Sequence, residues 1–350
     1  MKRVAVVILN WNTGDYLKEF LPGVIRSCAL NGDAETVVAD NASEDGSREL
    51  LKESFPGVRT ILLDRNYGFT GGYNRALQEL ESEATPPEFY LLLNSDIEVD
   101  GDWIAPLLAW MDSHPDCGIC GPKLHALLRE GGRYVRSGRF EYAGAAGGLM
   151  DGFGFPYCRG RVRGRTAEDR GQYDAPADVL WVTGACLLVR ASLWRRLGGL
   201  DERFFAHMEE IDLCWRAQLS GYRVTVVPES TVWHLGGGTL PRTSPWKLQL
   251  NFRNNLLLLE NNLAATLVAA GCNPEKAWRK ARRKIRFRLF LDNCARFFYF
   301  CTGRTAYAAA VRKAHLEWRE LRKGGKPALK PAEGARIEGL AGGSILFKKV

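Results

Sequence analysis

Short hydrophobic runs alternate with longer amphipathic stretches through the first hundred residues of the chain. Four runs rich in valine, leucine and isoleucine predict β-strands, at residues 4–9, 36–40, 58–63 and 89–93. The stretches between them carry hydrophobic residues at helical spacing and predict helices, at residues 16–30, 45–54 and 72–83. This alternation predicts an α/β fold, in which helices cover both faces of a mostly parallel central sheet.

The pattern is less regular between residues 101 and 175. We expect a helix over residues 103–113 and an apolar strand over residues 117–124. Residues 131–175 are rich in glycine and arginine, which predicts a long surface segment with mobile parts.

Regular elements return after residue 178. Two apolar runs, at residues 179–182 and 186–189, flank a turn of small residues. A strand is expected over residues 223–227, and the main domain is expected to end near residues 236–238. Before that strand we expect a helix that carries four polar side chains, His207, Glu209, Glu210 and Asp212.

The C-terminal part of the chain is helical in pattern and strongly basic. We expect a helical extension over residues 241–325, most of it within 246–323, and a loosely ordered tail over residues 326–350. Basic residues precede an aromatic run here: Lys276, Arg279, Lys280, Arg282, Arg283, Lys284, Arg286 and Arg288, then Phe297, Phe298, Tyr299 and Phe300. This combination suits an amphipathic helix on an anionic bilayer, and it equally suits a solvated helix packed on its own domain.

Composition narrows the class of protein. With 46% hydrophobic and 25% charged residues among 350, the chain is expected to be globular. The net charge of +8 suits nucleic acid, anionic lipid or a phosphorylated substrate. The N-terminal apolar run is too short for a signal peptide, and no run approaches the roughly 18 apolar residues of a membrane-spanning helix. Nine cysteines, with one close pair at Cys117 and Cys120, are read as buried thiols of a cytoplasmic protein.

Polar residues directly follow each of the first four predicted strands. In open parallel sheets, ligands bind beyond the carboxyl ends of the strands, so these residues are the first candidates for a site. No Gly-x-Gly-x-x-Gly motif follows the first strand, which argues against a dinucleotide site. The candidates are Asn10, Trp11 and Asn12; Asp40 and Asn41; Asp64, Arg65 and Asn66; and Asn94, Ser95 and Asp96.

Two of these positions suit a nucleotide. Asp40 can accept hydrogen bonds from a pyrimidine N–H or a ribose hydroxyl, although polar residues end most strands. Residues 66–74 form a glycine-rich turn that opens a helix, and we expect its free N–H groups to face phosphate or ribose oxygens. The alternative is a turn with no ligand.

Three further features suit metal and proton chemistry. Asp96 could hold a divalent cation together with diphosphate oxygens, or it could simply cap the turn before the next helix. His234 could add an imidazole ligand, which would favour manganese over magnesium, or it could be a hydrogen-bonded loop residue. Glu209, Glu210 and Asp212 crowd three carboxylates into one helical turn, which raises carboxylate pKa values and prepares a general base, unless this is a solvated helix start.

Taken together, five segments resemble glycosyltransferase family 2, with the order and spacing of its rhamnosyltransferase-like members. They are residues 7–12 (VILNWN), 38–43 (VADNAS), 66–69 (NYGF), 93–97 (LNSDI) and 209–214 (EEIDLC). The resemblance covers about residues 3–240. It implies the GT-A fold, with a nucleotide-binding half near residues 1–100 and an acceptor half near 101–240, and inverting single displacement from a nucleotide sugar.

The resemblance also implies roles for single residues. Asp40 resembles the family's base-binding aspartate, Asp96 the last residue of its Asp-x-Asp metal motif, and His234 its late metal-binding histidine. Glu210 stands where the family usually has the aspartate of a Glu-Asp catalytic pair, which leaves the base between Glu210 and Glu209. Asn94 replaces the first aspartate of the metal motif, and the absence of Gln-x-x-Arg-Trp favours addition of a single sugar.

The resulting hypothesis is a metal-dependent glycosyltransferase using Mn2+ or Mg2+. Its donor would be a dTDP- or UDP-sugar, its acceptor a glycan or lipid-linked glycan, with no nucleic acid bound and a peripheral membrane contact through 246–323. The alternatives are a sugar nucleotidyltransferase and a non-catalytic basic protein that binds nucleic acid or membrane. The donor residues expected are Asn10, Asn12, Asp40, Asn41, Asn66, Gly68, Phe69, Gly72, Asn74, Asn94 and Ser95, and the acceptor residues are Trp181, Thr183, Gly184, Ala185 and Asp212.

Overall fold

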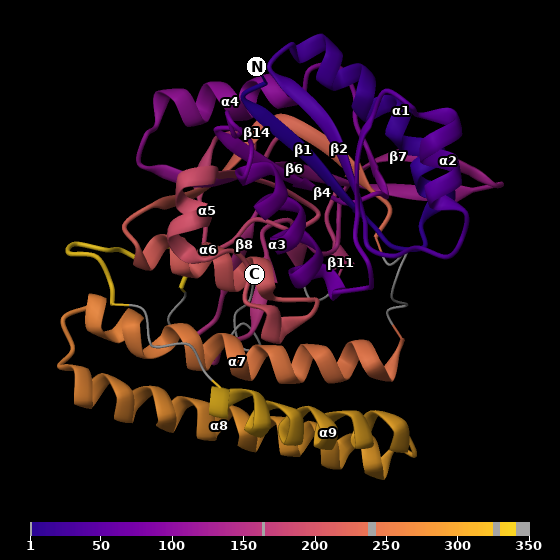
Figure 1. Cartoon of the computed structure of the whole chain (residues 1–350). Helices are drawn as coiled ribbons and strands as arrows, with labels where there is room; N and C mark the ends of the chain where they lie inside the picture. Colours follow the sequence, from indigo (N-terminus) through magenta and orange to yellow (C-terminus); the bar gives the residue numbers. More distant parts are fainter. Residues whose placement is uncertain (1, 163–164, 237–242, 325–329, 341–350) are drawn as a thin grey trace.

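A ten-stranded mixed sheet forms the centre of the protein within the described residues, 2–162, 165–236, 243–324 and 330–340, of a computed structural model (Figure 1). The strand order is β12-β14-β6-β13-β4-β1-β2-β3, with β5 paired to β14 and β7 to β6. In chain order, the first elements are β1 (Val4–Asn10), α1 (Gly14–Asn31), β2 (Ala34–Asp40), α2 (Ser47–Ser54), β3 (Arg59–Leu62), α3 (Gly68–Glu81) and β4 (Phe89–Leu93).

These four strands are parallel, as the sequence predicts, because both of their faces are buried. Along β1, Val4, Val6 and Ile8 pack in one core while Ala5 and Val7 pack in the other. The register pairs the last residue of β1 with the last residue of β2, so their carboxyl ends meet at one edge of the sheet.

The second half of the sheet mixes strand directions. β13 lies between β4 and β6 and runs antiparallel to both. The elements are β5 (Ile97–Glu98), α4 (Ile104–Ser113), β6 (Cys117–Glu130), β7 (Arg133–Phe140), β8 (Gly148–Met150), β9 (Pro156–Cys158), β10 (Arg161–Val162), β11 (Arg165–Thr166), β12 (Ala177–Asp178), β13 (Cys186–Arg190), α5 (Ala191–Leu197), η1 (Glu202–Phe204), α6 (Glu209–Leu219) and β14 (Arg223–His234).

Much of residues 131–175 is not the surface segment that the sequence predicts. β7 forms a hairpin with β6, and Phe140, Met150 and Cys158 lie in the main core. The glycines mislead because here they permit close packing: a Cβ on Gly148 would lie 1.9 Å from the Trp181 ring. Residues 163–164 of this segment lie outside the described residues.

The residues near the C-terminus and the cysteines also differ in part from expectation. Residues 330–340 pack on the body, where Ala332 N–H donates to the Leu219 carbonyl at 2.8 Å and Met150 N–H to the Gly339 carbonyl at 3.0 Å. The rest of the predicted tail, and residues 237–238 at the expected domain end, lie outside the described residues. All nine cysteines are free, and Cys294 and Cys301 are exposed rather than buried.

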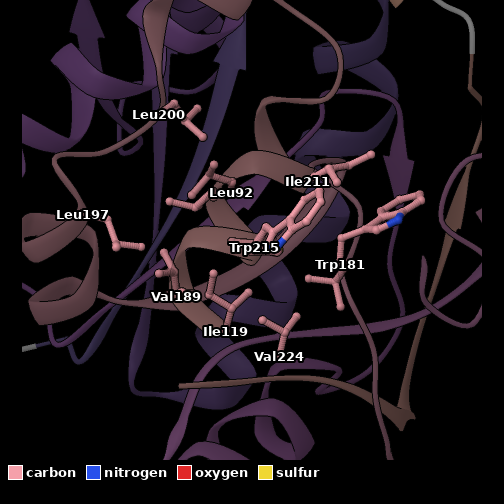
Figure 2. Close-up of a cluster of buried hydrophobic side chains, with 14 of the residues drawn as sticks. Leu92, Ile119, Trp181, Val189, Leu197, Leu200, Ile211, Trp215 and Val224 are labelled. Atoms are coloured by element: carbon pink, nitrogen blue, oxygen red, sulfur yellow. The ribbon is translucent and has the colours of Figure 1, made fainter. Parts of the chain in front are cut away.

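Helix α6 is fixed on the sheet by the main core. Figure 2 shows Trp215 and Ile211 of α6 over side chains from four strands, Leu92, Ile119, Val189 and Val224. Trp215 is 1% exposed, and its indole N–H donates to Thr266 Oγ1 of the next helix at 2.8 Å. The orientation of α6, which begins with Glu209 and Glu210, is therefore set by the core.

Three helices form the C-terminal extension, as predicted: α7 (Pro245–Ala269), α8 (Pro274–Cys301) and α9 (Thr305–Leu321), followed by η2 (Arg322–Gly324). α7 lies between the body and the layer of α8 and α9 (Figure 1). Among the described residues, no helix combines the length and apolar character needed to cross a bilayer.

Asp212 joins the body to this extension. Its carboxylate accepts hydrogen bonds from Arg216 Nε at 2.6 Å, Asn261 Nδ2 at 3.0 Å and Asn262 Nδ2 at 2.8 Å, and it is fully buried. Both oxygens are thus engaged inside the protein. These contacts do not support the expectation that Asp212 binds the acceptor, and they assign it to packing α6 on α7.

We expect Asp212→Ala to lower the free energy of unfolding by about 3–5 kcal/mol, because it leaves the buried Arg216 guanidinium without its carboxylate. Urea denaturation measures the change. Glu168→Ala is the matched control, since its ion pair with Arg170 is exposed and should contribute at most about 1 kcal/mol. Equal stability of the two variants would contradict the assignment.

Candidate active site

Asp40 lies at the shared carboxyl end of β1 and β2. Its carboxylate accepts hydrogen bonds from Asn10 Nδ2 at 2.9 Å, Ser43 N–H at 3.0 Å and Arg48 Nε at 2.6 Å. Burial alone would raise the pKa of Asp40, but the hydrogen bonds from Ser43, Arg48 and Asn10 outweigh it and lower the pKa. Asp40 is therefore ionised. The sequence analysis missed Arg48. Its Nε bonds the Asp40 oxygen that was expected to accept a hydrogen bond from an N–H of the nucleotide base.

The neighbouring asparagines shape the loops around Asp40. Asn41 Nδ2 donates to Asn66 Oδ1 and to the Gly68 carbonyl, both at 3.0 Å. Asn12 has a positive φ of 53° and accepts a hydrogen bond from Glu44 N–H at 2.8 Å. Asn12 thus joins the loops after β1 and β2, and Asn41 joins the loop after β2 to the one between β3 and α3.

The helix start after residue 66 is not open to a phosphate, so this part of the sequence prediction is wrong. The N–H groups of Phe69 and Thr70 both donate to the Phe205 carbonyl, at 2.9 and 3.2 Å. Gly68 is required by the Phe205 ring, which would lie 2.5 Å from a Cβ at that position. Gly72 packs on Leu9 in the same way.

Asn74 is also engaged within the protein. Its side chain donates to the Leu200 carbonyl and accepts from Leu200 N–H, both at 2.9 Å. The glycine-rich turn and Asn74 thus fasten α3 to the loop of residues 199–205. These contacts leave the turn a supporting role.

Asp96, His234 and Glu141 form a buried charged cluster beyond β4. His234 Nε2 lies 3.2 Å from Asp96 Oδ1, and His234 Nδ1 lies 3.7 Å from Glu141 Oε1. Burial alone would lower the pKa of His234, but the two carboxylates outweigh it and raise the pKa to about 10. Glu141 gave no sequence signal, because it stands 93 positions before its partner in a segment read as surface loop.

This cluster fits one half of a divalent cation site. Among the described residues, no group of three or more His, Cys, Asp or Glu side chains is arranged to hold a metal. Asp96 would supply one carboxylate and His234, once it loses its proton, one imidazole nitrogen, and a donor diphosphate would supply the remaining oxygens. A carboxylate and an imidazole together favour manganese. Glu141 on the other ring nitrogen matches the outer carboxylate that orients many metal-binding histidines.

Glu209 and Glu210 are the first two residues of α6. One carboxylate oxygen of each is shielded from solvent. Oε2 of both residues is buried and has no hydrogen-bond partner within the described parts of the chain. Burial, and then the charge of Glu210, raises the pKa of Glu209 well above its ordinary value, whereas burial raises the pKa of Glu210 to about 7. The pKa of Glu210 is therefore close to neutral pH, and the shift of Glu209 has the same direction.

Glu210 faces the turn of small residues that precedes β13. A Cβ on Gly184 would lie 3.3 Å from Glu210 Cβ and 3.6 Å from the Phe69 ring. Thr183 and Ala185 are nearly buried, and Ala185 N–H donates to Thr183 Oγ1 at 3.3 Å. Trp181 lies further back, with its indole N–H bonded to the Leu149 carbonyl at 3.2 Å, and it belongs to the core rather than to this turn.

A continuous series of contacts joins these groups. From Asp40 it runs through Asn10 to Thr13, whose hydroxyl lies 2.6 Å from Asn10 Oδ1 and 2.9 Å from Ser95 Oγ. Asn94 N–H then donates to the Ala185 carbonyl at 2.8 Å, beside Gly184 and therefore Glu210. The loops after β1, β2 and β4 and the turn before β13 thus meet at one edge of the sheet. Thr13 is a residue of this series of contacts that the sequence analysis missed.

A strained loop precedes Glu209. Phe205, His207 and Met208 have positive φ values of 63°, 71° and 69°, which non-glycine residues seldom adopt. Asn254 of α7 stabilises the loop, because its Nδ2 donates to the carbonyls of Phe204, Ala206 and His207 at 2.7–3.0 Å. The sequence analysis expected His207 on the helix, but His207 lies before α6, which begins at Glu209.

Comparisons with known proteins identify the family. The model of glycosyl transferase family 2 matches residues 5–165, and that of glycosyl transferase family group 2 matches residues 160–246. The chain belongs to glycosyltransferase family 2, in its rhamnosyltransferase-like branch, and is a glycosyltransferase.

Two curated relatives illustrate this branch. One is the N-acetylglucosaminyl-diphospho-decaprenol L-rhamnosyltransferase of Mycobacterium tuberculosis, 29% identical over 236 residues, or 65% of this chain and 75% of that protein. The other is the rhamnosyltransferase WbbL of Escherichia coli, 25% identical over 232 residues, or 64% of this chain and 80% of that protein.

Solved structures show that the fold is GT-A. GalNAc-T7 with UDP, GalNAc and Mn2+ superimposes with a TM-score of 0.57 at 18% identity, over 85% of this chain and 57% of that one. The mannosyltransferase PcManGT from Pyrobaculum calidifontis, in complex with GDP-Man and Mn2+, gives a TM-score of 0.52 at 15% identity, over 91% of this chain and 87% of that one.

We expect Glu141→Gln to weaken Mn2+ binding about 10- to 100-fold, because a neutral amide orients His234 less firmly than a carboxylate. Calorimetric titration of Mn2+ in the presence of a nucleoside diphosphate measures the affinity without any turnover. Glu130→Gln, an exposed change at the end of β6, serves as the control. An unchanged affinity in Glu141→Gln would remove Glu141 from the metal site.

We expect Asn254→Ala to lower kcat by about 10- to 100-fold, because loss of three hydrogen bonds lets the strained loop relax and moves Glu210. Hydrogen exchange should be faster across residues 204–208, and the free energy of unfolding should fall by roughly 1–3 kcal/mol. Asn251→Ala, about one turn earlier on α7 and partly exposed, is the control. Exchange that stays slow in Asn254→Ala would refute the role of this amide.

Proposed function

We propose that the protein is an inverting, metal-dependent glycosyltransferase that adds one sugar from a dTDP- or UDP-sugar to a hydroxyl of a lipid-linked glycan. One observation carries this proposal. A carboxylate whose pKa is raised to about 7, Glu210, lies at the same sheet edge as the buried pair Asp96 and His234. A titrating base and a cation site are the two groups that single-displacement sugar transfer requires.

In this reaction Glu210 removes the proton of the acceptor hydroxyl while that oxygen attacks the anomeric carbon. Attack from the face opposite the leaving diphosphate inverts the configuration at that carbon. Mn2+ or Mg2+ held by Asp96 and His234 would neutralise charge on the departing diphosphate. Asp40 would bind the pyrimidine through an N–H that takes the place of Arg48 Nε at its Oδ1.

The relatives support the donor and the acceptor. Two of them are rhamnosyltransferases, which makes rhamnose the sugar that we propose. The name of the mycobacterial enzyme specifies a diphospho-decaprenol acceptor, and such a lipid lies in a membrane. We therefore propose that the chain acts in the cytoplasm at a membrane face.

The composition of α8 supports this location. The helix carries nine Lys or Arg and two acidic residues, a net +7 of the +8 of the whole chain. Its second half exposes large aromatic rings, with Phe290, Phe297 and Phe300 60–69% exposed. An exposed aromatic surface next to clustered cations suits the boundary of an anionic bilayer.

Product analysis tests the proposed reaction. The full chain is incubated with Mn2+, a lipid-linked N-acetylglucosamine diphosphate, and dTDP-rhamnose or a UDP-sugar. Release of free nucleoside diphosphate together with glycosylated lipid is expected. Release of pyrophosphate would instead identify a nucleotidyltransferase.

We expect Glu210→Gln to lower kcat by about 10²–10⁴ while leaving donor binding nearly unchanged, because it removes the general base only. The same change should raise the free energy of unfolding at pH 8. When the pKa of a carboxyl group is higher in the folded than in the unfolded protein, the free energy of unfolding falls as the pH rises above the unfolded pKa. A neutral amide causes no such fall. Kinetic assays and thermal melting at pH 8 measure both effects.

Glu209→Gln is the matched control, because it makes the same change at the adjacent residue of α6. It should keep kcat within about tenfold of the wild type and keep a rate that increases with pH through about 7, where Glu210 ionises. If Glu209→Gln lost activity and Glu210→Gln did not, the base would be Glu209.

A further inference from the structure

A basic cavity lies between α8 and α9, apart from the sheet edge that holds the candidate active site. Its volume is about 560 Å³, within the range of small-molecule sites. Its lining combines three apolar side chains with five cations: Ile285, Leu289 and Trp318, with Arg282, Arg286, Arg319, Arg322 and Lys323.

The charges of this cavity are only partly neutralised. Arg322 pairs with Glu260 at 2.6 Å and Lys323 with Glu320 at 2.7 Å. Within the described part of the chain, Arg282, Arg286 and Arg319 have no acidic partner. Arg282 and Arg286 come from α8 and Arg319 from α9, and Arg282 also stacks on the Trp278 ring, 4.4 Å from its centroid. Guanidinium groups that line one cavity repel, and a multiply charged anion would relieve that repulsion.

A buried aromatic side chain lines the same cavity. Trp318 is 3% exposed and contributes to the apolar part of the lining. Arg322 stacks on the same ring, 4.6 Å from its centroid.

We infer that this cavity binds the phosphate monoester headgroup of an anionic lipid. A phosphate monoester carries close to two negative charges and three acceptor oxygens, which match guanidinium groups that have no acidic partner among the described residues. Guanidinium groups bind phosphate in pairs of parallel hydrogen bonds. The apolar floor then receives the first carbons of the lipid.

The surroundings of the cavity favour a lipid over a soluble phosphate. Arg286 is followed directly by Phe287, 44% exposed, whose ring lies 6.2 Å from that of the exposed Phe290. These rings would enter the same bilayer whose headgroup occupies the cavity. The inference rests on the membrane contact proposed above, and it does not depend on sugar transfer.

Vesicle binding by the full chain tests the inference. The vesicles contain phosphatidylcholine with either phosphatidic acid, a monoester, or phosphatidylglycerol, a diester, in amounts that give the same surface charge. We expect the wild type to bind the phosphatidic acid vesicles at least about fivefold more tightly. Arg286→Gln with Arg319→Gln should abolish that preference.

The matched control is Arg279→Gln with Arg283→Gln, which removes the same charge from α8 outside the cavity lining. It should weaken binding to both kinds of vesicle by a similar factor and keep the preference. Circular dichroism verifies that each variant is folded. Equal behaviour of the two double variants would overturn the inference and leave only a diffuse basic surface.

Titration with inorganic phosphate and pyrophosphate in the absence of vesicles separates the two sources of the anion. Millimolar or weaker binding of both, beside a clear preference for phosphatidic acid, supports a lipid headgroup. Tight binding of free pyrophosphate without any lipid preference would overturn it in favour of a soluble ligand. A failure of glycosyl transfer in the product assay would leave these binding results unaffected.

Discussion

The burial of two adjacent carboxylates at the start of α6 is the constraint on which the rest of the site depends. Burial removes hydration from both carboxylates and raises both pKa values, that of Glu210 to about 7, and the charge of Glu210 raises that of Glu209 further. The N-terminus of α6 offsets part of this cost, because its dipole and backbone N–H groups favour negative charge. The cost becomes useful when Glu210 must accept a proton at neutral pH.

Holding such a pair in place requires support from outside the sheet domain. Asn254 of α7 stabilises the strained loop before α6, and Asp212 fixes the following turn of α6 to Asn261 and Asn262 of α7. The C-terminal helices therefore support the proposed catalytic carboxylates and also form a separate surface. If the same helices also contact a membrane, they would bring a lipid-linked acceptor near Glu210, the proposed base.

The sequence predicts the features that arise from local pattern and misses those that arise from distant contacts. Buried runs give the parallel strands, and the residues after each strand give the positions of Asp40 and Asp96. Glu141 and Asn254 carry no such pattern, because their partners lie 93 and about 50 positions away in the chain. The glycine-rich turn misled for a related reason, since a packed Phe205 ring and a phosphate require the same absence of a Cβ.

The charge distribution separates two tasks that a single net charge obscures. Residues 1–236 contain 25 Lys or Arg and 33 Asp or Glu, a net −8, whereas α8 alone carries a net +7 and the rest of the C-terminal region is also basic. A negatively charged body must bind an anionic donor through local groups, such as the cation that we propose at Asp96 and His234, rather than through a general positive field. The positive field is located instead on the C-terminal helices, where it would attract an anionic surface without competing for the donor. Division of charge between body and extension thus lets one chain recognise two phosphate-bearing partners at different places.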